Sequence, residues 1–186
     1  MAEPRLYFYF LSDPAVGYDF QKANATEAQI VKDAVLVSTP GDFVMRALFR
    51  VRETGGKIAQ MVISGHGGPD VFRIGATSVN LDTIAAWTPV FSMLTPHFAE
   101  NAVVTIQACD FARSTKLLTA LSLIWGVRVQ GWTGDIDVYK WWLFEGVAPE
   151  GDRIVCVHGM CHTEEVDADV DDHRTGVGLL LPHSPF

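Results

Sequence analysis

Short apolar runs of strand length alternate along the chain with longer stretches whose apolar residues recur at helical spacing. Strands are predicted over 6–11, 57–64, 101–107, 127–130 and 153–158. Helices are predicted over 24–35, 41–53 and 114–125, with a further helix beginning near residue 81. Alternation of this kind is typical of α/β proteins with a largely parallel sheet. We therefore expect a three-layer α/β/α sandwich with a mostly parallel central sheet.

Capping residues and glycines between these elements predict where helices begin and where the chain turns. The helix over 24–35 would begin at the N-cap Asn24 and place Val35 on its apolar side. Two strand-like runs, 71–74 and 77–79, flank a Gly-Ala pair and predict a small hairpin. Glycines predict a tight loop over 65–69, and residues 131–149 are rich in loop signals.

The length of 186 residues fits one domain, since domains average about 150 residues. Apolar residues make up 48% of the chain and charged residues 19%, which are ordinary values for a globular protein. We assign 1–162 to one α/β domain and 163–186 to an acidic C-terminal segment, exposed over 163–175 and otherwise partly packed on the domain. Six acids crowd into 164–172: Glu164, Glu165, Asp167, Asp169, Asp171 and Asp172.

Charge and hydropathy exclude two classes of partner. The net charge is −8, and without 163–186 the remaining 13 basic and 16 acidic residues give −3. No basic stripe is present, so we expect no nucleic-acid partner. The longest apolar runs, 6–11 and 179–181, are far shorter than the roughly 18 to 20 residues of a membrane span, so we expect no membrane partner either.

The cysteines bear on the compartment. There are three, Cys109, Cys156 and Cys161, and the N-terminus lacks the basic start and small-residue cleavage site of a secretory signal. An odd and sparse count predicts free thiols rather than a disulfide framework. We therefore expect a reducing, cytoplasmic location.

Two polar residues follow the ends of predicted parallel strands. His66 comes after the strand over 57–64, and Cys109 comes 43 residues later, after the strand over 101–107. The carboxyl ends of parallel strands are where α/β proteins gather functional groups. Imidazole is a natural base for a thiol, and the glycines after His66 permit a turn whose N–H groups face a developing oxyanion. The pattern indicates a nucleophilic Cys109 with His66 as its base.

These strand ends, Ile63-Ser64-Gly65-His66-Gly67 and Ile106-Gln107-Ala108-Cys109, resemble those of the caspase-like (clan CD) cysteine peptidases, over roughly 58–133. The resemblance implies that the two strands lie side by side, with Cys109 as nucleophile and His66 as general base and acid. It also implies that the N–H groups of Gly67 and Cys109 bind the oxyanion. Asp110 and Phe111 depart from the caspase signature, so the bacterial caspase-like domains are the better comparison.

Specificity stays open at this point. The resemblance implies that Gln107 helps to line the pocket for the side chain preceding the cleaved bond. Asp135 and Asp137 would favour a basic side chain there, whereas Arg73 would favour an acidic one. We expect a protein or peptide substrate and a regulatory protein partner.

Alternatives come from other classes of protein. A catalytically silent caspase-like module would act through protein contacts alone. The set Cys156, His158, Cys161 and His162 offers zinc ligands, but the paired Cys-x2-Cys spacing is missing. Asp167, Asp169 and Asp171 resemble the start of a calcium loop without its glycine and its final glutamate. No nucleotide-binding or serine-hydrolase motif is present, and we expect no cofactor or metal.

Overall fold

The computed structural model describes residues 3–12, 34–136 and 150–164. The strands are β1 (Arg5–Ser12), β2 (Val35–Val37), β3 (Lys57–Ser64), β4 (Gly67–Gly68), β5 (Val71–Ile74), β6 (Thr77–Asn80), β7 (Phe98–Gln107), β8 (Arg128–Trp132), β9 (Arg153–Val157) and β10 (Met160–Glu164). The helices are α2 (Pro40–Thr54), α3 (Ile84–Phe91) and α4 (Lys116–Trp125), with the 3₁₀ helices η2 (Ser92–His97) and η3 (Phe111–Arg113).

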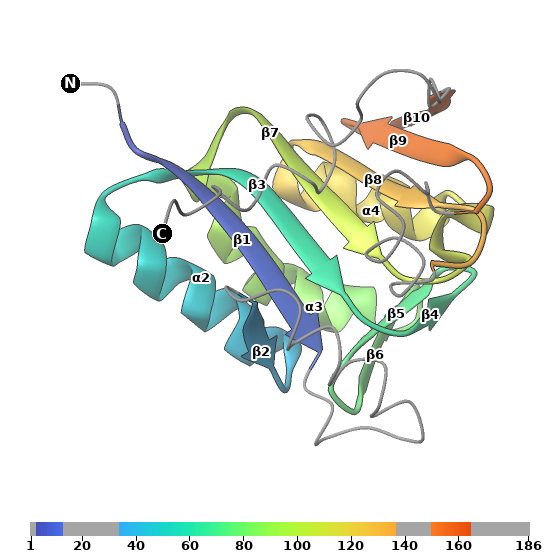
Figure 1. Ribbon diagram of the computed structural model, residues 1–186, viewed down its shortest axis with the longest axis horizontal. Helices are drawn as coiled ribbons and strands as arrows, with labels where there is room; N and C mark the ends of the chain where they lie inside the picture. Colours follow the sequence, from blue (N-terminus) through green and yellow to red (C-terminus); the bar gives the residue numbers. More distant parts are fainter. Residues whose placement is uncertain (1–2, 13–33, 137–149, 165–186) are drawn as a thin grey trace, which may run out of the picture.

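Seven strands form one twisted sheet in the order β10-β9-β8-β7-β3-β1-β2 (Figure 1). The pairs from β2 to β8 are parallel, whereas β9 pairs antiparallel with β8 and β10 antiparallel with β9. A second, antiparallel sheet holds β4, β5 and β6. The predicted α/β class and mostly parallel sheet are confirmed.

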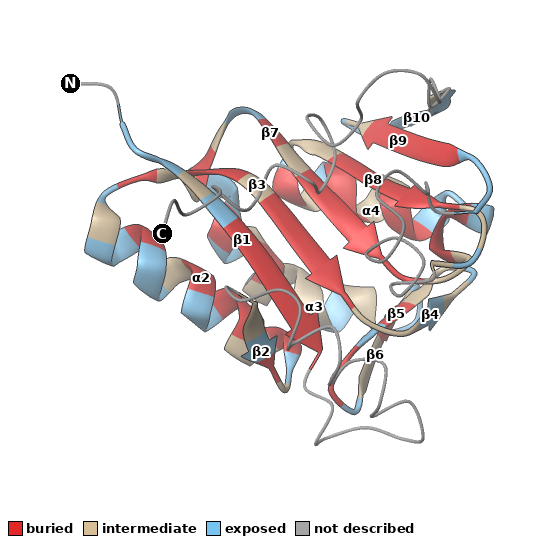
Figure 2. Ribbon diagram, viewed as in Figure 1, coloured by how far each residue is buried: buried red, intermediate tan, exposed pale blue. Residues whose placement is uncertain are grey.

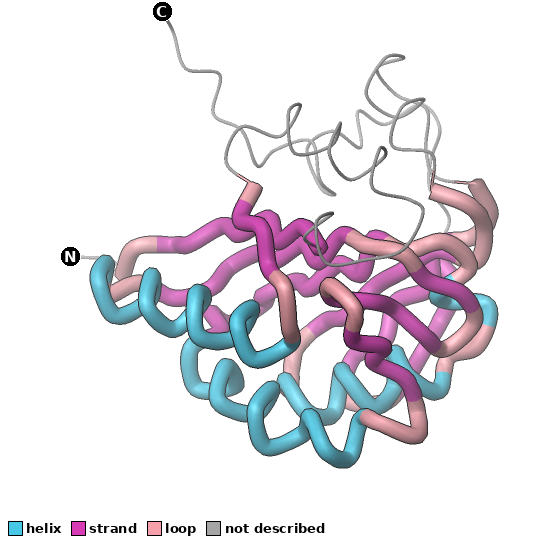
Figure 3. Tube along the Cα trace, turned by 90° about the horizontal axis from the view of Figure 1, so that it is seen from below, coloured by secondary structure: helices cyan, strands magenta, loops and turns pink. Residues whose placement is uncertain are grey.

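The described helices all lie on one face of the sheet. Figure 3 shows α2, α3 and α4 beneath the strands as a single layer. The predicted helix over 24–35 falls outside the described residues up to residue 33, so a second helical layer stays a prediction. None of the described helices has the length and apolar character needed to cross a membrane.

The core fills the space between the sheet and these helices, and Figure 2 shows the central strands as mostly buried. Helix α2 begins at Thr39, whose hydroxyl accepts from Asp42 N at 3.0 Å, and ends at Gly55 in the left-handed conformation (φ 65°). Its Phe43 packs edge-on against Phe10 of β1, with ring centroids 4.9 Å apart. The two caps thus fix where the helix begins and ends, and its apolar face packs on the sheet.

Three element predictions need correction. Val35 belongs to β2, not to a helix, because 35–37 is a short apolar run that pairs with the end of β1 just before the N-cap of α2. The expected loop over 65–69 contains β4, since Gly67 and Gly68 pair with β5. The expected loop over 131–149 begins with the last two residues of β8.

Strand β10 was not predicted. Its Thr163 and Glu164 fall in the segment that we assigned to the C-terminal tail, and the exposed pattern of the strand hides it from a hydrophobicity argument. Glu164 Oε2 lies 2.6 Å from Arg128 Nη2 and 2.9 Å from Arg153 Nη2. Ion pairs to the adjacent strand β9 and to β8 beyond it therefore help to hold this polar edge strand in the sheet.

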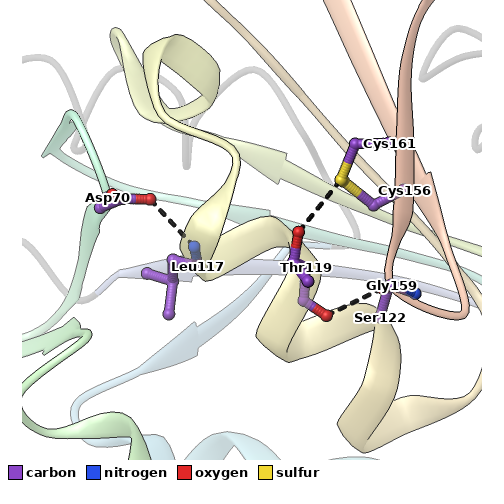
Figure 4. Close-up of a disulfide and its surroundings, with 7 residues drawn as sticks. All are labelled: Asp70, Leu117, Thr119, Ser122, Cys156, Gly159 and Cys161. Carbon is purple, nitrogen blue, oxygen red and sulfur yellow. Dashed lines mark hydrogen bonds between the residues drawn. A yellow bond between two sulfur atoms is a disulfide. The ribbon is translucent and has the colours of Figure 1, made fainter.

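The prediction of three free thiols is wrong. Cys156 and Cys161 lie directly opposite each other on β9 and β10 and form a disulfide (Figure 4). Cys109 is the free thiol. Thr119 of α4 contacts the Cys161 sulfur at 3.2 Å. The sequence spacing alone does not reveal that a hairpin pairs the two residues. The argument for a reducing compartment loses its support, and both thiols of the proposed zinc set are engaged in the bond.

Thiol counting tests this pairing. In denaturant without reductant, iodoacetamide is expected to modify one cysteine per chain, Cys109, and all three after reduction. Because the bond closes a loop of sequence separation 5, Cys161→Ala is expected to lower the free energy of unfolding by about 2 kcal/mol. Urea unfolding measures this loss, with Cys109→Ser as the control that keeps the bond. Three reactive thiols without reductant would refute the pairing.

Candidate functional site

The two predicted site strands are neighbours in the middle of the sheet. Strands β3 and β7 pair in parallel, and Ser64 lies opposite Gln107 at their last paired position. Gly65 N then donates to Gln107 O at 3.1 Å, which continues the alignment beyond both strands. His66 and Cys109 each follow two residues after the matched pair. They therefore leave the sheet side by side at the same edge, where Figure 1 shows the tips of β3 and β7.

The β4–β5 hairpin fixes the chain around His66. Arg73 N donates to His66 O at 2.8 Å, so these two residues form a hydrogen-bonded antiparallel pair. The next pair, Gly67 with Phe72, is then of the non-hydrogen-bonded kind. Its geometry leaves the Gly67 N–H outside the β4–β5 ladder, as an oxyanion donor requires.

Gly67 is packed tightly against the end of β7. A Cβ at this position would lie 2.6 Å from the Ala108 Cβ, 2.7 Å from the Val71 carbonyl oxygen and 3.3 Å from the Cys109 carbonyl oxygen. No side chain fits there without moving the backbone beside Cys109. The sequence needs glycine here for the close approach, not only for a turn.

The backbone of Ile136 contacts the Cys109 sulfur. Ile136 N donates to Sγ at 3.4 Å, and Sγ lies 3.9 Å from the Ile136 carbonyl oxygen. Asp110 N donates to Gly134 O at 2.9 Å, which joins the chain after Cys109 to the same segment. Residues 134–136 thus cover one side of the thiol.

That covering segment is anchored by residues 150–152, which lead into β9. Thr133 N donates to Asp152 O at 3.0 Å, and Asp152 N donates back to the Thr133 hydroxyl at 2.8 Å. Glu150 N donates to Asp135 O at 3.1 Å. Sequence reasoning missed the role of Ile136, because a backbone group acts and no side-chain pattern marks it.

Asp70 joins the loops that follow the two strands. It lies four residues after His66, and its carboxylate accepts from Leu117 N at 2.9 Å in the first turn of α4 (Figure 4). A carboxylate at a helix N-terminus satisfies a donor and complements the helix dipole. The chain after His66 and the helix after Cys109 are thereby held at a fixed separation.

The site holds both groups neutral at rest. Burial, together with the carboxylates of Asp135 and Asp110, raises the pKa of the Cys109 thiol, although the N–H groups of Ile136 and Cys109 itself partly oppose this. Burial and the positive charge of Arg73 lower the pKa of His66. At neutral pH the pair is therefore a thiol and an uncharged imidazole, which is a base able to take the thiol proton.

The other predicted site residues separate into three groups. Besides burial, Asp135 raises the pKa of the Cys109 thiol, and Arg73 lowers the pKa of His66. Gln107 is 4% exposed, and its Oε1 accepts from the Tyr9 hydroxyl at 2.7 Å. Asp137 lies outside the described residues. Within the parts of the chain that the structure describes, no group of three or more His, Cys, Asp or Glu is placed to hold a metal ion.

The resting state has a testable pH dependence. Because its pKa is raised, Cys109 carries less thiolate than an ordinary thiol at any given pH, so its alkylation by iodoacetamide is expected to be slow at pH 7 and to rise throughout the alkaline range. Asp135→Asn removes a nearby negative charge and is expected to speed alkylation at pH 8. Asp82→Asn, at an exposed carboxylate elsewhere, is the control. A fast plateau below pH 7 would contradict a neutral resting pair.

No protein-family model matches the sequence, and no curated protein matches it.

Proposed function

We propose that this protein is a cysteine endopeptidase of the caspase-like kind, with a three-layer fold closer to the bacterial domains than to the true caspases. The observation that carries the proposal is the register of β3 and β7. Ser64 opposite Gln107 brings His66 and Cys109 to one sheet edge on adjacent strands. The resemblance of the two strand ends to those of the caspase-like peptidases implies the same arrangement.

The proposed reaction uses the neutral pair. The Cys109 sulfur attacks the carbonyl carbon of a bound peptide while His66 takes the thiol proton. The tetrahedral intermediate collapses, and His66 passes this proton to the leaving amine. Water then attacks the thioester with His66 as base, which frees the acid product and restores the thiol. A lowered His66 pKa supports this role, since the imidazole is available as a base at neutral pH.

The developing oxyanion would receive two backbone donors. We assign these roles to the Gly67 N–H, which lies outside the β4–β5 ladder, and to the N–H of Cys109 itself, which is next to the reacting sulfur in the chain. Such donors are effective because they need no reorganisation during the reaction. Ile136 N–H, which contacts the sulfur at rest, would stabilise the thiolate as it forms.

Charge around the sulfur supports a basic side chain before the cleaved bond. Besides burial, the negative charges of Asp135 and Asp110 raise the pKa of Cys109. The positive charge of Arg73, by contrast, adds to burial in lowering the pKa of His66. Asp110 Oδ1 is already 3.2 Å from Arg113 Nε, so Asp135 is the available partner for a substrate cation. Of the two specificities that the sequence left open, we propose the basic one.

Fluorogenic peptides test this specificity. Substrates with Lys or Arg before the cleaved bond are expected to have kcat/KM values at least about 10-fold above those with Asp or Leu, because a charge-assisted hydrogen bond contributes about 1.5–3 kcal/mol. Asp135→Asn is expected to remove most of that difference, and Asp82→Asn to leave it. A preference for Asp that Arg73→Gln removes would reverse the assignment of the pocket.

A silent interaction module is the second candidate. The contacts of the sulfur with the Ile136 backbone, and pKa shifts opposite to those of a thiolate–imidazolium pair, favour a thiol that stays protonated. The two candidates differ in one result. A silent module cleaves none of the fluorogenic peptides at a rate that falls when Cys109 is replaced.

A further inference from the structure

The first half of β1 has only one neighbouring strand among the described residues. On one side it pairs with β3 from Arg5 to Leu11. On the other side β2 pairs only with Phe10, Leu11 and Ser12. Within the described ranges 3–12, 34–136 and 150–164, the backbone over 5–8 thus presents an open strand edge, which is a template for pairing with another extended segment.

A groove runs along this open edge, between β1 and α2, with a volume of about 880 Å³. We call it the β1 groove; its lining includes Arg5, Tyr7, Met45, Arg46, Phe49 and Arg50. Tyr7, Met45 and Phe49 are 52%, 59% and 64% exposed, so three large apolar side chains face solvent around one groove. Clustered exposed apolar residues of this kind mark interaction surfaces.

The groove carries the opposite charge to the chain. Three arginines and Glu53 line it, whereas the whole protein has a net charge of −8. Arg46 is paired with Asp42 at 2.8 Å, but Arg50 lies 3.8 Å from Glu53 in a loose, exposed pair, and Arg5 is exposed. Excess arginine beside exposed apolar side chains complements an acidic partner that also carries apolar residues.

We propose that the β1 groove binds an extended segment of a partner protein in which acidic and apolar residues alternate. The segment would add to β1 as a strand, pairing its backbone with the open edge over 5–8. Its apolar side chains would pack on Met45 and Phe49, and its carboxylates would meet Arg5 and Arg50. Strand addition takes its affinity from main-chain hydrogen bonds and its specificity from alternate side chains.

This surface is separate from the candidate catalytic site. The parallel strands begin together at Arg5 and Lys57, whereas His66 and Cys109 follow the strand ends. The eight residues of β3 span roughly 25 Å between those two ends of the sheet. Binding at the β1 groove does not rest on the proposed peptidase activity and is measured without it.

A fluorescent ten-residue peptide of alternating Val and Glu is the probe, with polarisation as the readout on the full chain. We expect saturable binding that Phe49→Ala and Arg50→Glu each weaken at least about 10-fold. Leu123→Ala, at an exposed leucine of α4, and Arg52→Glu, on α2 outside the groove lining, are the matched controls and are expected to change little. Substituting Lys for Glu, or methylating the peptide nitrogens, is expected to abolish binding.

Four results would overturn the proposal. One is no saturable binding up to about 1 mM peptide, a weak-affinity limit. Another is equal weakening by the groove variants and their controls. A dimer in sedimentation that Phe49→Ala dissociates would assign the groove to a second copy. Binding that occurs only after Asp167, Asp169 and Asp171 are replaced by Asn would assign it to the chain's own acidic segment.

Discussion

Replacing Cys109 with Ala is expected to lower kcat/KM for the best peptide substrate by at least about 10⁴-fold, because no other group at the site forms the covalent intermediate. His66→Ala is expected to cause a loss of similar size, since the thiol has a raised pKa and depends on a base. The two changes remove one catalytic unit, so the double variant is expected to be no worse than either single variant.

The kinetic comparison needs controls for purity and folding. His162→Ala, at an imidazole whose side chain is 58% exposed on β10, is expected to keep full activity. Circular dichroism and the urea midpoint of each variant establish that the fold is intact. A Cys109→Ala protein that still cleaves the peptide would show that the nucleophile lies elsewhere.

Gly67→Ala is expected to reduce kcat by roughly 10²-fold or more. The added Cβ would collide with the Ala108 Cβ at 2.6 Å and with the Val71 carbonyl oxygen at 2.7 Å, and neither can yield without moving backbone. The displaced backbone carries the Gly67 and Cys109 amides that the proposal assigns to the oxyanion. A shift of about 1 Å in such groups can cost 10²-fold in rate.

The next residue supplies the matched control. At Gly68 an added Cβ would lie 3.5 Å from the Val71 Cγ1, which is ordinary contact. Gly68→Ala is therefore expected to keep kcat within a few-fold of the wild type. Both glycines belong to β4, so a similar fall in kcat for both would point to damage of the hairpin rather than to the oxyanion donors.

Much of the sheet could be predicted because its central strands β1, β3 and β7 each contain a mostly apolar and buried run. The expected strand over 57–64 coincides with β3, and the hairpin predicted around Gly75 is the β5–β6 pair. Buried parallel strands give continuous apolar runs that one-dimensional reasoning detects. Because His66 and Cys109 both follow the ends of predicted parallel strands, they could also be expected at one sheet edge.

Other features depend on contacts that no local pattern encodes. The disulfide follows from the register of β9 with β10, and β10 itself is held by the ion pairs of Glu164 rather than by burial. The covering of the Cys109 sulfur by Ile136 uses backbone atoms. The pKa of His66 is lowered by burial and by the charge of Arg73, and the hairpin pairs the backbones of these two residues. Each of these requires the folded chain.

A peptide acyloxymethyl ketone with Lys next to the reactive carbon tests the central claim most directly, because a thiolate displaces its carboxylate and forms a stable thioether. Intact mass and peptide mapping measure the labelling. We expect one label, on Cys109, formed far faster than the reaction with iodoacetamide and lost in His66→Ala and in urea. Labelling of the folded protein that is absent, or that proceeds equally in His66→Ala, would contradict a His66–Cys109 peptidase site.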